Sequence, residues 1–350
     1  MDPIAFIQTK VLPAFPDVAD ATIAPLPGGL INQTFLVEAG PRRFVLQRLA
    51  AIFPPAINDN VAAVTGALAR AGLPTPRLQP TRDGRAGLDL GPEGGVWRLQ
   101  TYLDGVCFEQ VQSPAQAGAA GALVARFHRA LDGLAYPFAG LRSGVHDTPR
   151  HLARLREALA QHSEHRLRDE VAPLAERLFA HATALPPLPT LPTRVCHGDL
   201  KLSNVLFAGP TPPASEQAVC LIDLDTVGPQ SLAYELGDAW RSWCNRSGED
   251  SERARIDLEV FRDSFLAYRE AIGRPLATEE RRALLGSVEW ISLELASRFA
   301  ADALAESYFG WDAQRYPGRG EHNLVRARGQ LVLHEAFVAT RPARAAILGV

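Results

Sequence analysis

Residues 195–207 of this 350-residue chain read Val195-Cys196-His197-Gly198-Asp199-Leu200-Lys201-Leu202-Ser203-Asn204-Val205-Leu206-Phe207. An apolar strand runs into a polar loop, and a second apolar strand leads out of it. A third apolar strand follows and ends in two carboxylates: Val219-Cys220-Leu221-Ile222-Asp223-Leu224-Asp225. Functional side chains are commonly carried on loops that a rigid scaffold positions, so this block is expected to hold the chemistry.

The spacing of the polar residues in this block is typical of phosphoryl transfer. Asn204 stands five positions after Asp199, and Asp223 stands nineteen positions after Asn204. This reaction needs metal ions to bridge phosphate oxygens and one carboxylate to hold the attacking hydroxyl in line. Mg²⁺ prefers oxygen ligands, which an Asn carbonyl and an Asp carboxylate supply. We therefore expect Asp199 to be the catalytic base, Asn204 and Asp223 to bind Mg²⁺, and Lys201 to contact the transferring phosphate of ATP, with His197 as a scaffold residue.

Length and composition limit the classes of protein to consider. A chain of 350 residues suits two lobes that share a cleft, and a hydrophobic content of 47% with 21% charged residues is typical of a globular protein. A net charge of −3 gives no long-range attraction to nucleic acid or to an anionic membrane, so neither is an expected partner. No apolar run suits a signal peptide or a membrane span. The four cysteines show no paired metal spacing, which favours free thiols in the cytoplasm.

The pattern along the chain predicts a strand-rich N-terminal lobe of residues 1–104. A helix is expected at Ala56–Ala71, because Val61, Val64 and Leu68 recur at helical spacing before Gly72 and Pro74. Short apolar or alternating segments bounded by turn residues predict five strands, at Thr22–Leu26, Asn32–Glu38, Arg43–Leu49, Arg77–Pro80 and Val96–Leu103.

Residues 105–350 are expected to form a larger, mostly helical lobe around the block at 194–225. The lobe boundary is placed near Asp104–Gly105. Helical patterns occur at Pro114–Leu131, Arg150–Gln161, Leu167–Ala184, Leu232–Cys244, Arg253–Ile272, Thr278–Glu306 and His322–Thr340. Together the two halves predict an α+β fold of the two-lobed protein-kinase type, with a small antiparallel sheet and a helical C-terminal lobe.

The motif resembles that of a known enzyme family. His197-Gly198-Asp199 with Asn204 and Ile222-Asp223 is similar to the catalytic loop and metal motif of the aminoglycoside-phosphotransferase and choline-kinase type of phosphotransferase. A narrower resemblance is to the N-acetylhexosamine 1-kinases. It rests on Phe44-Val45-Leu46-Gln47-Arg48, Lys201 with Asn204-Val205-Leu206, Ile222-Asp223-Leu224-Asp225-Thr226-Val227, Gly237-Asp238 with Arg241, Arg298-Phe299 with Asp302, and His322-Asn323-Leu324 with Arg326, Arg328 and Gln330.

The resemblance implies a kinase that moves the γ-phosphate of ATP, with Mg²⁺, onto a sugar hydroxyl. The narrower form implies the anomeric hydroxyl of an N-acetylhexosamine or hexose, and a sugar 1-phosphate as the product. Two alternatives stay open: a kinase of another small alcohol, such as an aminoglycoside, choline or homoserine, and a catalytically inactive nucleotide-binding regulator of the same fold. The intact Asp199, Asn204 and Asp223 argue against the regulator.

The expected nucleotide site departs from the protein-kinase pattern. Gly28, Gly29 and Asn32 lie between the first two predicted strands, where a hairpin can cover phosphates with its backbone amides. A lysine on the third strand usually contacts the α- and β-phosphates, but this strand has none. Arg48 is the nearest cation and is expected to take that role. Because side chains alternate along a strand, either Arg48 or its neighbour Gln47 faces the nucleotide, but not both.

Two further features complete the nucleotide side. The helix after the third strand has no glutamate to pair with a cation, and Asp59 is the acidic residue that stands there instead. Tyr102, at the lobe junction, is expected to present backbone groups to the adenine.

The helix at Thr278–Glu306 is expected to face the acceptor. Glu294, Arg298 and Asp302 recur every four residues on one face, a pattern that on its own is typical of a solvated salt-bridge stripe. The resemblance to N-acetylhexosamine 1-kinases implies instead that Arg298 contacts the sugar, together with Tyr308.

The helix after the metal motif supplies further candidates. Asp238 and Arg241 lie one turn apart and are expected to bond sugar hydroxyls, whereas the alternative is that Glu235 and Asp238 brace the catalytic loop through its backbone amides. Asp225 points the same way along its strand as Asp223, which makes it a candidate ligand for the sugar or for a second metal ion.

Overall fold

The structure, a computed structural model, describes residues 3–26, 32–142 and 144–350. Its backbone contacts divide the chain into two units. The small unit consists of Met1–Gly105 with two later segments, Ala130–Leu141 and Cys220–Gly228. The large unit consists of Val106–Arg129, Arg142–Val219 and Pro229–Val350. The chain therefore returns to the small unit with the segment that carries Asp223 and Asp225.

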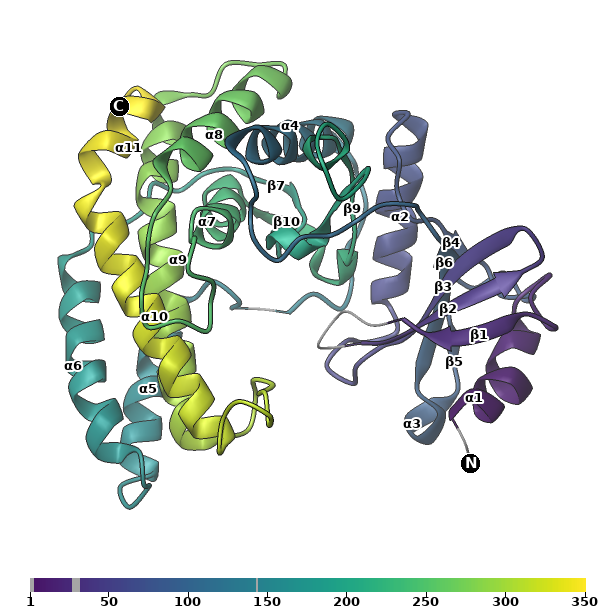
Figure 1. Cartoon of the computed structure of the whole chain (residues 1–350), viewed down its shortest axis with the longest axis horizontal. Coiled ribbons are helices and arrows are strands. Elements are labelled where there is room, and N and C mark those ends of the chain that lie inside the picture. Colours follow the sequence, from purple (N-terminus) through teal and green to yellow (C-terminus); the bar gives the residue numbers. More distant parts are fainter. Residues whose placement is uncertain (1–2, 27–31, 143) are drawn as a thin grey trace. The chain divides into compact units, whose positions relative to one another are not determined.

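A six-stranded sheet forms the centre of the small unit (Figure 1). Its strands run in the order β1-β2-β3-β6-β4, with β5 also paired to β6, and every pairing is antiparallel. One face packs on the N-terminal helical segment, where Val37, Leu46 and Leu99 are buried. The strands are β1 (Thr22–Pro25), β2 (Gln33–Ala39), β3 (Arg42–Arg48), β4 (Leu78–Gln79), β5 (Leu88–Asp89) and β6 (Val96–Thr101).

The helix α2 (Ile57–Arg70) follows β3, as the sequence pattern predicts. Its Val61, Val64 and Leu68 are buried, which confirms the helical spacing of these apolar residues. The helix stops at Gly72, whose φ of 75° is a left-handed backbone conformation that suits glycine.

The large unit is built mainly from helices arranged around α9 (Thr278–Ala305), which contacts α5, α6, α7, α10 and α11. Figure 1 shows α9 and α10 lying side by side along much of their length. Gly237 in α7 allows a close approach to α9, because a Cβ there would lie 3.0 Å from Ser287. The other helices are α4 (Pro114–Ala130), α5 (Thr148–Gln161), α6 (Arg168–Ala184), α7 (Leu232–Trp243), α8 (Leu258–Ala271), α10 (Arg319–Ala339) and α11 (Arg341–Leu348).

Short strands frame the block at 195–225. β7 (Thr193–Cys196) pairs with β10 (Gly228–Ser231), and β8 (Val205–Phe207) pairs with β9 (Ala218–Leu221). The four cysteines are free thiols. Of the helices in the described ranges, none combines the length and the apolar character that crossing a bilayer requires.

Candidate active site

The loop at 197–204 is held by side chains of α7. Glu235 accepts two hydrogen bonds from the loop backbone, from His197 N to Oε1 at 2.8 Å and from Gly198 N to Oε2 at 2.9 Å. Gly198 has a φ of 82°, a left-handed conformation that lets successive amides point at one carboxylate. The sharp turn before Asp199 is therefore fixed by a buried acidic group.

Asp238 continues this support one helical turn later. Its Oδ2 accepts a hydrogen bond from Leu200 N at 3.1 Å, and Trp243 Nε1 donates to Leu200 O at 2.8 Å. Of the two roles that the sequence left open for Glu235 and Asp238, bracing the loop through its amides is the one that these contacts describe.

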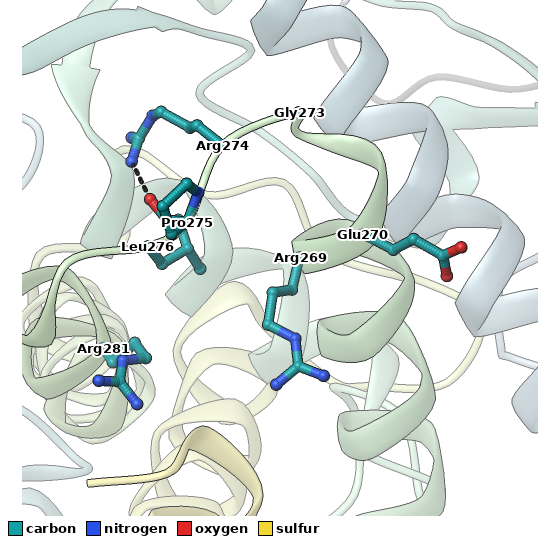
Figure 2. Close-up of a pocket in the computed structure, with 7 residues that line it drawn as sticks. All are labelled: Arg269, Glu270, Gly273, Arg274, Pro275, Leu276 and Arg281. Carbon is teal, nitrogen blue, oxygen red and sulfur yellow. Dashed lines mark hydrogen bonds between the residues drawn. The ribbon is translucent and has the colours of Figure 1, made fainter.

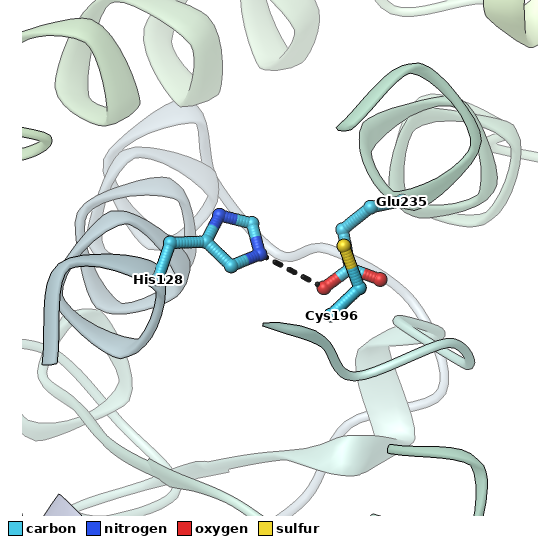
Figure 3. Close-up of side chains that lie close together, drawn as sticks. All are labelled: His128, Cys196 and Glu235. Atoms are coloured by element: carbon cyan, nitrogen blue, oxygen red, sulfur yellow. Dashed lines mark hydrogen bonds and ion pairs between the residues drawn. The ribbon is translucent and has the colours of Figure 1, made fainter. Parts of the chain in front are cut away.

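His128 of α4 points at the carboxylate of Glu235, and Cys196 lies close to both (Figure 3). His128 Nε2 is 3.1 Å from Glu235 Oε1 and its Nδ1 is 2.9 Å from the Tyr268 hydroxyl. A carboxylate only accepts, so Nε2 carries the proton and Nδ1 accepts from Tyr268. Burial lowers the pKa of His128, which keeps the ring neutral. Since both ring nitrogens and both carboxylate oxygens have partners, we interpret this cluster as a hydrogen-bonded brace.

Asp199 and Asn204 contact each other directly within the large unit. Asn204 Nδ2 donates to the backbone O of Asp199 at 2.8 Å and to its Oδ2 at 3.1 Å. Lys201 Nζ lies 3.2 Å from the same Asp199 Oδ2. The amide nitrogen of Asn204 is thus committed to Asp199, and its oxygen is the atom that remains for a cation. This donor set fits Mg²⁺, which binds amide and carboxylate oxygens.

Asp223 belongs to the small unit and has an unusual backbone. Its φ of 62° places a non-glycine residue in the left-handed region, immediately before the single turn Leu224–Thr226. Asp adopts this conformation more readily than most residues, and such backbone outliers concentrate at functional sites. The carboxylate of Asp223 therefore follows the apolar strand β9 at a turn with a constrained backbone.

Asp225 is buried in a polar cluster of the small unit. Its Oδ1 pairs with Arg98 of β6, and its Oδ2 accepts from Asn32 Nδ2 at 2.7 Å. Gln47 Oε1 accepts from Arg98 Nε at 2.9 Å and Nη2 at 2.6 Å. Both oxygens of Asp225 therefore accept hydrogen bonds from side chains of its own unit, and its role as a ligand for a sugar or a second metal ion stays a prediction.

Arg48 lies on the opposite face of β3 from Gln47. Its Nη2 donates to Glu93 O at 3.1 Å, and its guanidinium lies 5.9 Å from the centre of the Trp97 ring. The alternation along β3 thus places Gln47, not Arg48, beside Asp225. The role of Arg48 as the phosphate-binding cation stays a prediction.

Tyr102, which is expected to lie beside the adenine, contacts Arg43 of β3. The backbone N of Tyr102 bonds to Arg43 O at 3.2 Å, and its ring is covered by the Arg43 guanidinium. Gly28 and Gly29 lie outside the described residues.

Arg298 and Tyr308, the two residues that the resemblance assigns to the sugar, lie close together. The Arg298 guanidinium lies 6.0 Å from the centre of the Tyr308 ring and 5.4 Å from that of Phe309. Arg142 Nη2 donates to the Tyr308 hydroxyl at 2.8 Å. Tyr308 is 46% exposed, so two cations and a phenol gather at an accessible place on the large unit.

The other members of the α9 stripe are buried, which excludes a solvated face for them. Asp302 is 4% exposed and accepts from the backbone N of Tyr308 at 2.9 Å and of Phe309 at 2.8 Å. Glu294 is 2% exposed and accepts from Thr148 Oγ1 at 2.9 Å. Asp302 therefore fixes the segment that presents Tyr308.

Arg241 is buried between acidic groups of the large unit. Its Nη2 donates to Asp238 Oδ1 at 2.9 Å and its Nη1 to Glu249 Oε2 at 3.2 Å. The predicted pair of Asp238 and Arg241 is thus joined in one network with the loop at 197–204.

The chain is similar to one protein family and to several solved structures. Residues 22–284 match the phosphotransferase enzyme family.

The chain belongs to the phosphotransferase enzyme family.

Solved structures show that this phosphotransferase-family chain has the protein-kinase-like fold that its sequence predicted. A microcompartment-associated aminopropanol kinase is 18% identical, with 97% of this chain and 98% of that chain covered and a TM-score of 0.65. An aminoglycoside phosphotransferase from Alicyclobacillus acidocaldarius is 19% identical, with 94% and 98% covered and a TM-score of 0.57. An ethanolamine kinase from Plasmodium vivax is 12% identical, with 90% and 84% covered and a TM-score of 0.56. The similarity to N-acetylhexosamine 1-kinases remains a resemblance of short motifs.

Sequence reasoning missed two arginines that contact residues of the predicted site. Arg98 interrupts the apolar run Val96–Leu99, and a charged residue inside a buried strand is a signal that could have been used. Arg142 lies in a loop without any pattern, and only the fold brings it to Tyr308.

A cavity of about 460 Å³ occupies another part of the large unit (Figure 2). It is bordered by the end of α8, the turn at Gly273–Leu276 and Arg281 of α9. None of its lining residues belongs to the predicted site of this phosphotransferase.

Proposed function

We propose that this chain is an ATP-dependent kinase that phosphorylates a sugar, at the anomeric hydroxyl of an N-acetylhexosamine or hexose. The observation that carries the kinase activity is the contact between Asp199 and Asn204 on a loop braced by α7. Membership of the phosphotransferase enzyme family supports the same activity.

Asp199 is proposed as the group that orients and deprotonates the acceptor hydroxyl. Its Oδ2 is engaged by Asn204 and Lys201, which hold the carboxylate in one orientation. An ordinary Asp, with a pKa of about 3.9, is a weak base. Since the loose transition state of phosphoryl transfer demands little covalent help, correct orientation contributes more than basicity. The anomeric hydroxyl is the most acidic of a sugar's hydroxyls, which suits such a base.

Asn204 Oδ1 and the Asp223 carboxylate are proposed as ligands for Mg²⁺. When bound, the ion would bridge phosphate oxygens of ATP and neutralise their charge. The constrained backbone at Asp223 would keep its carboxylate in a fixed direction before the ion arrives.

Arg298 and Tyr308 are proposed to hold the sugar. Arg298 makes no hydrogen bond or ion pair with any residue in the described ranges, so its donors remain for a ligand. The Tyr308 ring offers an apolar face and its hydroxyl is fixed by Arg142. A planar donor beside an aromatic ring suits a molecule with hydroxyl groups on one edge and C–H groups on a face.

A second candidate is a kinase of a small amino alcohol. It is favoured by the fold shared with an aminopropanol kinase and an ethanolamine kinase. The two candidates make different demands on the acceptor site, because an amino alcohol carries a cation. Two arginines beside Tyr308 would repel that cation, which is why we place the sugar first.

The test is turnover of ATP with a panel of acceptors. N-acetylhexosamines, hexoses, aminopropanol, ethanolamine, choline, homoserine and aminoglycosides would be compared by ADP release at equal concentration. The proposal predicts that kcat/KM is highest for a reducing sugar. A preference for an amino alcohol would transfer the assignment to the second candidate. If no acceptor of the panel increases the release of ADP, both candidates are contradicted.

A further inference from the structure

The small unit lacks the lysine that protein kinases place on the third strand, and a buried arginine occupies the neighbouring strand. Gln47 of β3 and Arg98 of β6 are partners in the antiparallel register. Both side chains take part in one hydrogen-bonded cluster, because Gln47 Oε1 accepts from Arg98 Nε at 2.9 Å. A cation is therefore present on this face of the sheet, but it comes from β6.

The partner of this cation is part of the metal motif. Arg98 Nη1 donates to Asp225 Oδ1, and Asn32 Nδ2 donates to Asp225 Oδ2 at 2.7 Å. Asn32 is in turn fixed, since its Oδ1 accepts from Ala50 N at 2.9 Å. The carboxylate of Asp225 is thus held on one side by β6 and on the other by the residue that leads into β2.

Burial makes this pair a rigid connection. Arg98 is 1% exposed and Asp225 is 3% exposed. A buried charge that loses its partner is costly, so the two side chains keep one arrangement. Asp225 lies in the single turn Leu224–Thr226, which begins directly after the left-handed backbone of Asp223. Holding Asp225 therefore also holds the turn that directly follows Asp223.

We propose that Arg98 is a positioning residue for the Asp223 metal ligand. The inference rests on the proposed function and deepens it. Protein kinases pair the third-strand lysine with a glutamate of the following helix. This chain has neither residue, and the Arg98–Asp225 pair joins the sheet directly to the metal motif instead. The consequence is that metal binding depends on a strand residue that does not itself contact the ion.

The experiment measures binding, so that it needs no acceptor and no turnover. AMP-PNP would be titrated calorimetrically into the full chain at a series of Mg²⁺ concentrations. Arg98→Met should raise the Mg²⁺ concentration for half-maximal tight binding by about 10- to 100-fold, the range usual for losing a residue that orients a metal ligand without touching the metal. Asp225→Asn should act similarly, and the double variant should be little worse than either single variant, because both changes break the same pair.

Arg85→Met is the matched control. Arg85 forms an exposed ion pair with Asp83 in the same unit, at 2.7 Å, and its loss should leave the Mg²⁺ dependence unchanged. If Arg98→Met does not fold, Asn32→Ala replaces it, since this variant frees one oxygen of Asp225 without removing a charge. It should raise the required Mg²⁺ concentration several-fold.

The outcomes separate this inference from the proposed function. If Arg98→Met or Asn32→Ala folds and its AMP-PNP binding depends on Mg²⁺ as in the unmodified chain, the positioning role is overturned. This holds even if the variant melts at a lower temperature. An unmodified chain that binds no nucleotide with Mg²⁺ would instead contradict the proposed function itself. An unmodified chain that binds normally, with the predicted shift in the variants, supports the inference.

Discussion

Asp199 is the residue on which the proposed chemistry depends most directly. Asn204 and Lys201 surround its carboxylate, and Gly198 gives the loop its sharp turn. Asp199→Asn preserves shape but cannot accept a proton. We predict that kcat falls by about 10²- to 10⁴-fold, the usual contribution of general-base catalysis. AMP-PNP affinity should stay near that of the unmodified chain.

Steady-state kinetics and nucleotide titration would check this prediction. The exposed Asp20→Asn is the control, since it removes a carboxylate of the small unit far along the chain from the motif. An Asp199→Asn variant that keeps more than about a tenth of kcat, where chemistry limits the rate, is not compatible with a base at this position.

A substitution of Arg298 tests, at the scale of a single residue, whether the sugar binds beside Tyr308. Its guanidinium lies over the rings of Tyr308 and Phe309. If it donates to the sugar, Arg298→Ala loses a charged hydrogen bond worth about 1.5–3 kcal/mol, and kcat/KM for the sugar falls by about 10- to 150-fold. ATP affinity should not change, because no nucleotide role is assigned to this residue.

The matched control is Arg282→Ala, an exposed arginine on the same helix. The two variants would be compared by sugar kinetics and by calorimetric ATP binding. Equal sugar kinetics in both variants would mean that Arg298 only covers the aromatic rings.

At the scale of elements, α7 supports the loop at 197–204 that carries the proposed base. Glu235 accepts from the amides of His197 and Gly198 and from His128. Burial opposes its ionisation, but the bonds from His128 and the backbone amides outweigh burial and lower the pKa of Glu235. The helix thus presents an ionised carboxylate to the loop.

Glu235→Gln keeps the size of this side chain and replaces one acceptor oxygen by an NH₂ group. A buried donor then faces a backbone donor or His128, at a cost of about 1–3 kcal/mol in the free energy of unfolding. We predict a lower melting temperature together with a lower kcat, since the turn before Asp199 loosens. Glu157→Gln, at an exposed position of α5, is the control for both measurements.

Elements with a clear period could be predicted from the sequence. α2 is marked by Val61, Val64 and Leu68, and the observed helix differs from the predicted range by one residue at each end. β10 could not be predicted, because Gly-Pro-Gln-Ser has no strand pattern and forms a strand only by pairing with β7. The helix α11 was also missed. Its Arg344 reads as a surface residue, yet it is buried against Glu289 of α9.

In the candidate site, too, contacts between residues close in sequence could be predicted, whereas contacts between distant residues could not. The contact between Asp199 and Asn204 in the loop at 197–204 was predictable because these residues are close in sequence. The Arg98–Asp225 pair was not, because its members are 127 residues apart and only the return of the chain to the small unit brings them together. Arg142 meets Tyr308 across 166 residues for the same reason.

At the scale of the whole molecule, buried histidines should make the fold sensitive to mild acid. Burial lowers the pKa of His128, His151, His322 and His334 below the ordinary value. As the pH falls below about 6.5, these rings take up protons in the unfolded chain but not in the folded one. The unfolded state then binds more protons, so stability decreases as the pH falls through this window.

Calorimetric melting between pH 7.5 and pH 5 would check this prediction. Each histidine that stays neutral in the folded state should cost up to about 1.4 kcal/mol per pH unit below its unfolded pKa. His334→Gln should reduce the slope, because it removes one of these groups. A melting temperature that stays constant down to pH 5 would contradict the account of the buried rings.

Phosphorus NMR of the reaction product tests the central claim most directly. The chain would be incubated with ATP, Mg²⁺ and the sugar that the acceptor panel ranks first, with Asp199→Asn as the blank. The account predicts a new phosphate ester whose phosphorus couples to the anomeric proton and which is readily hydrolysed by acid. This ester should be absent from the Asp199→Asn blank. A phosphate on another hydroxyl of the sugar, at a ring carbon or at C6, would contradict the assignment as a sugar 1-kinase.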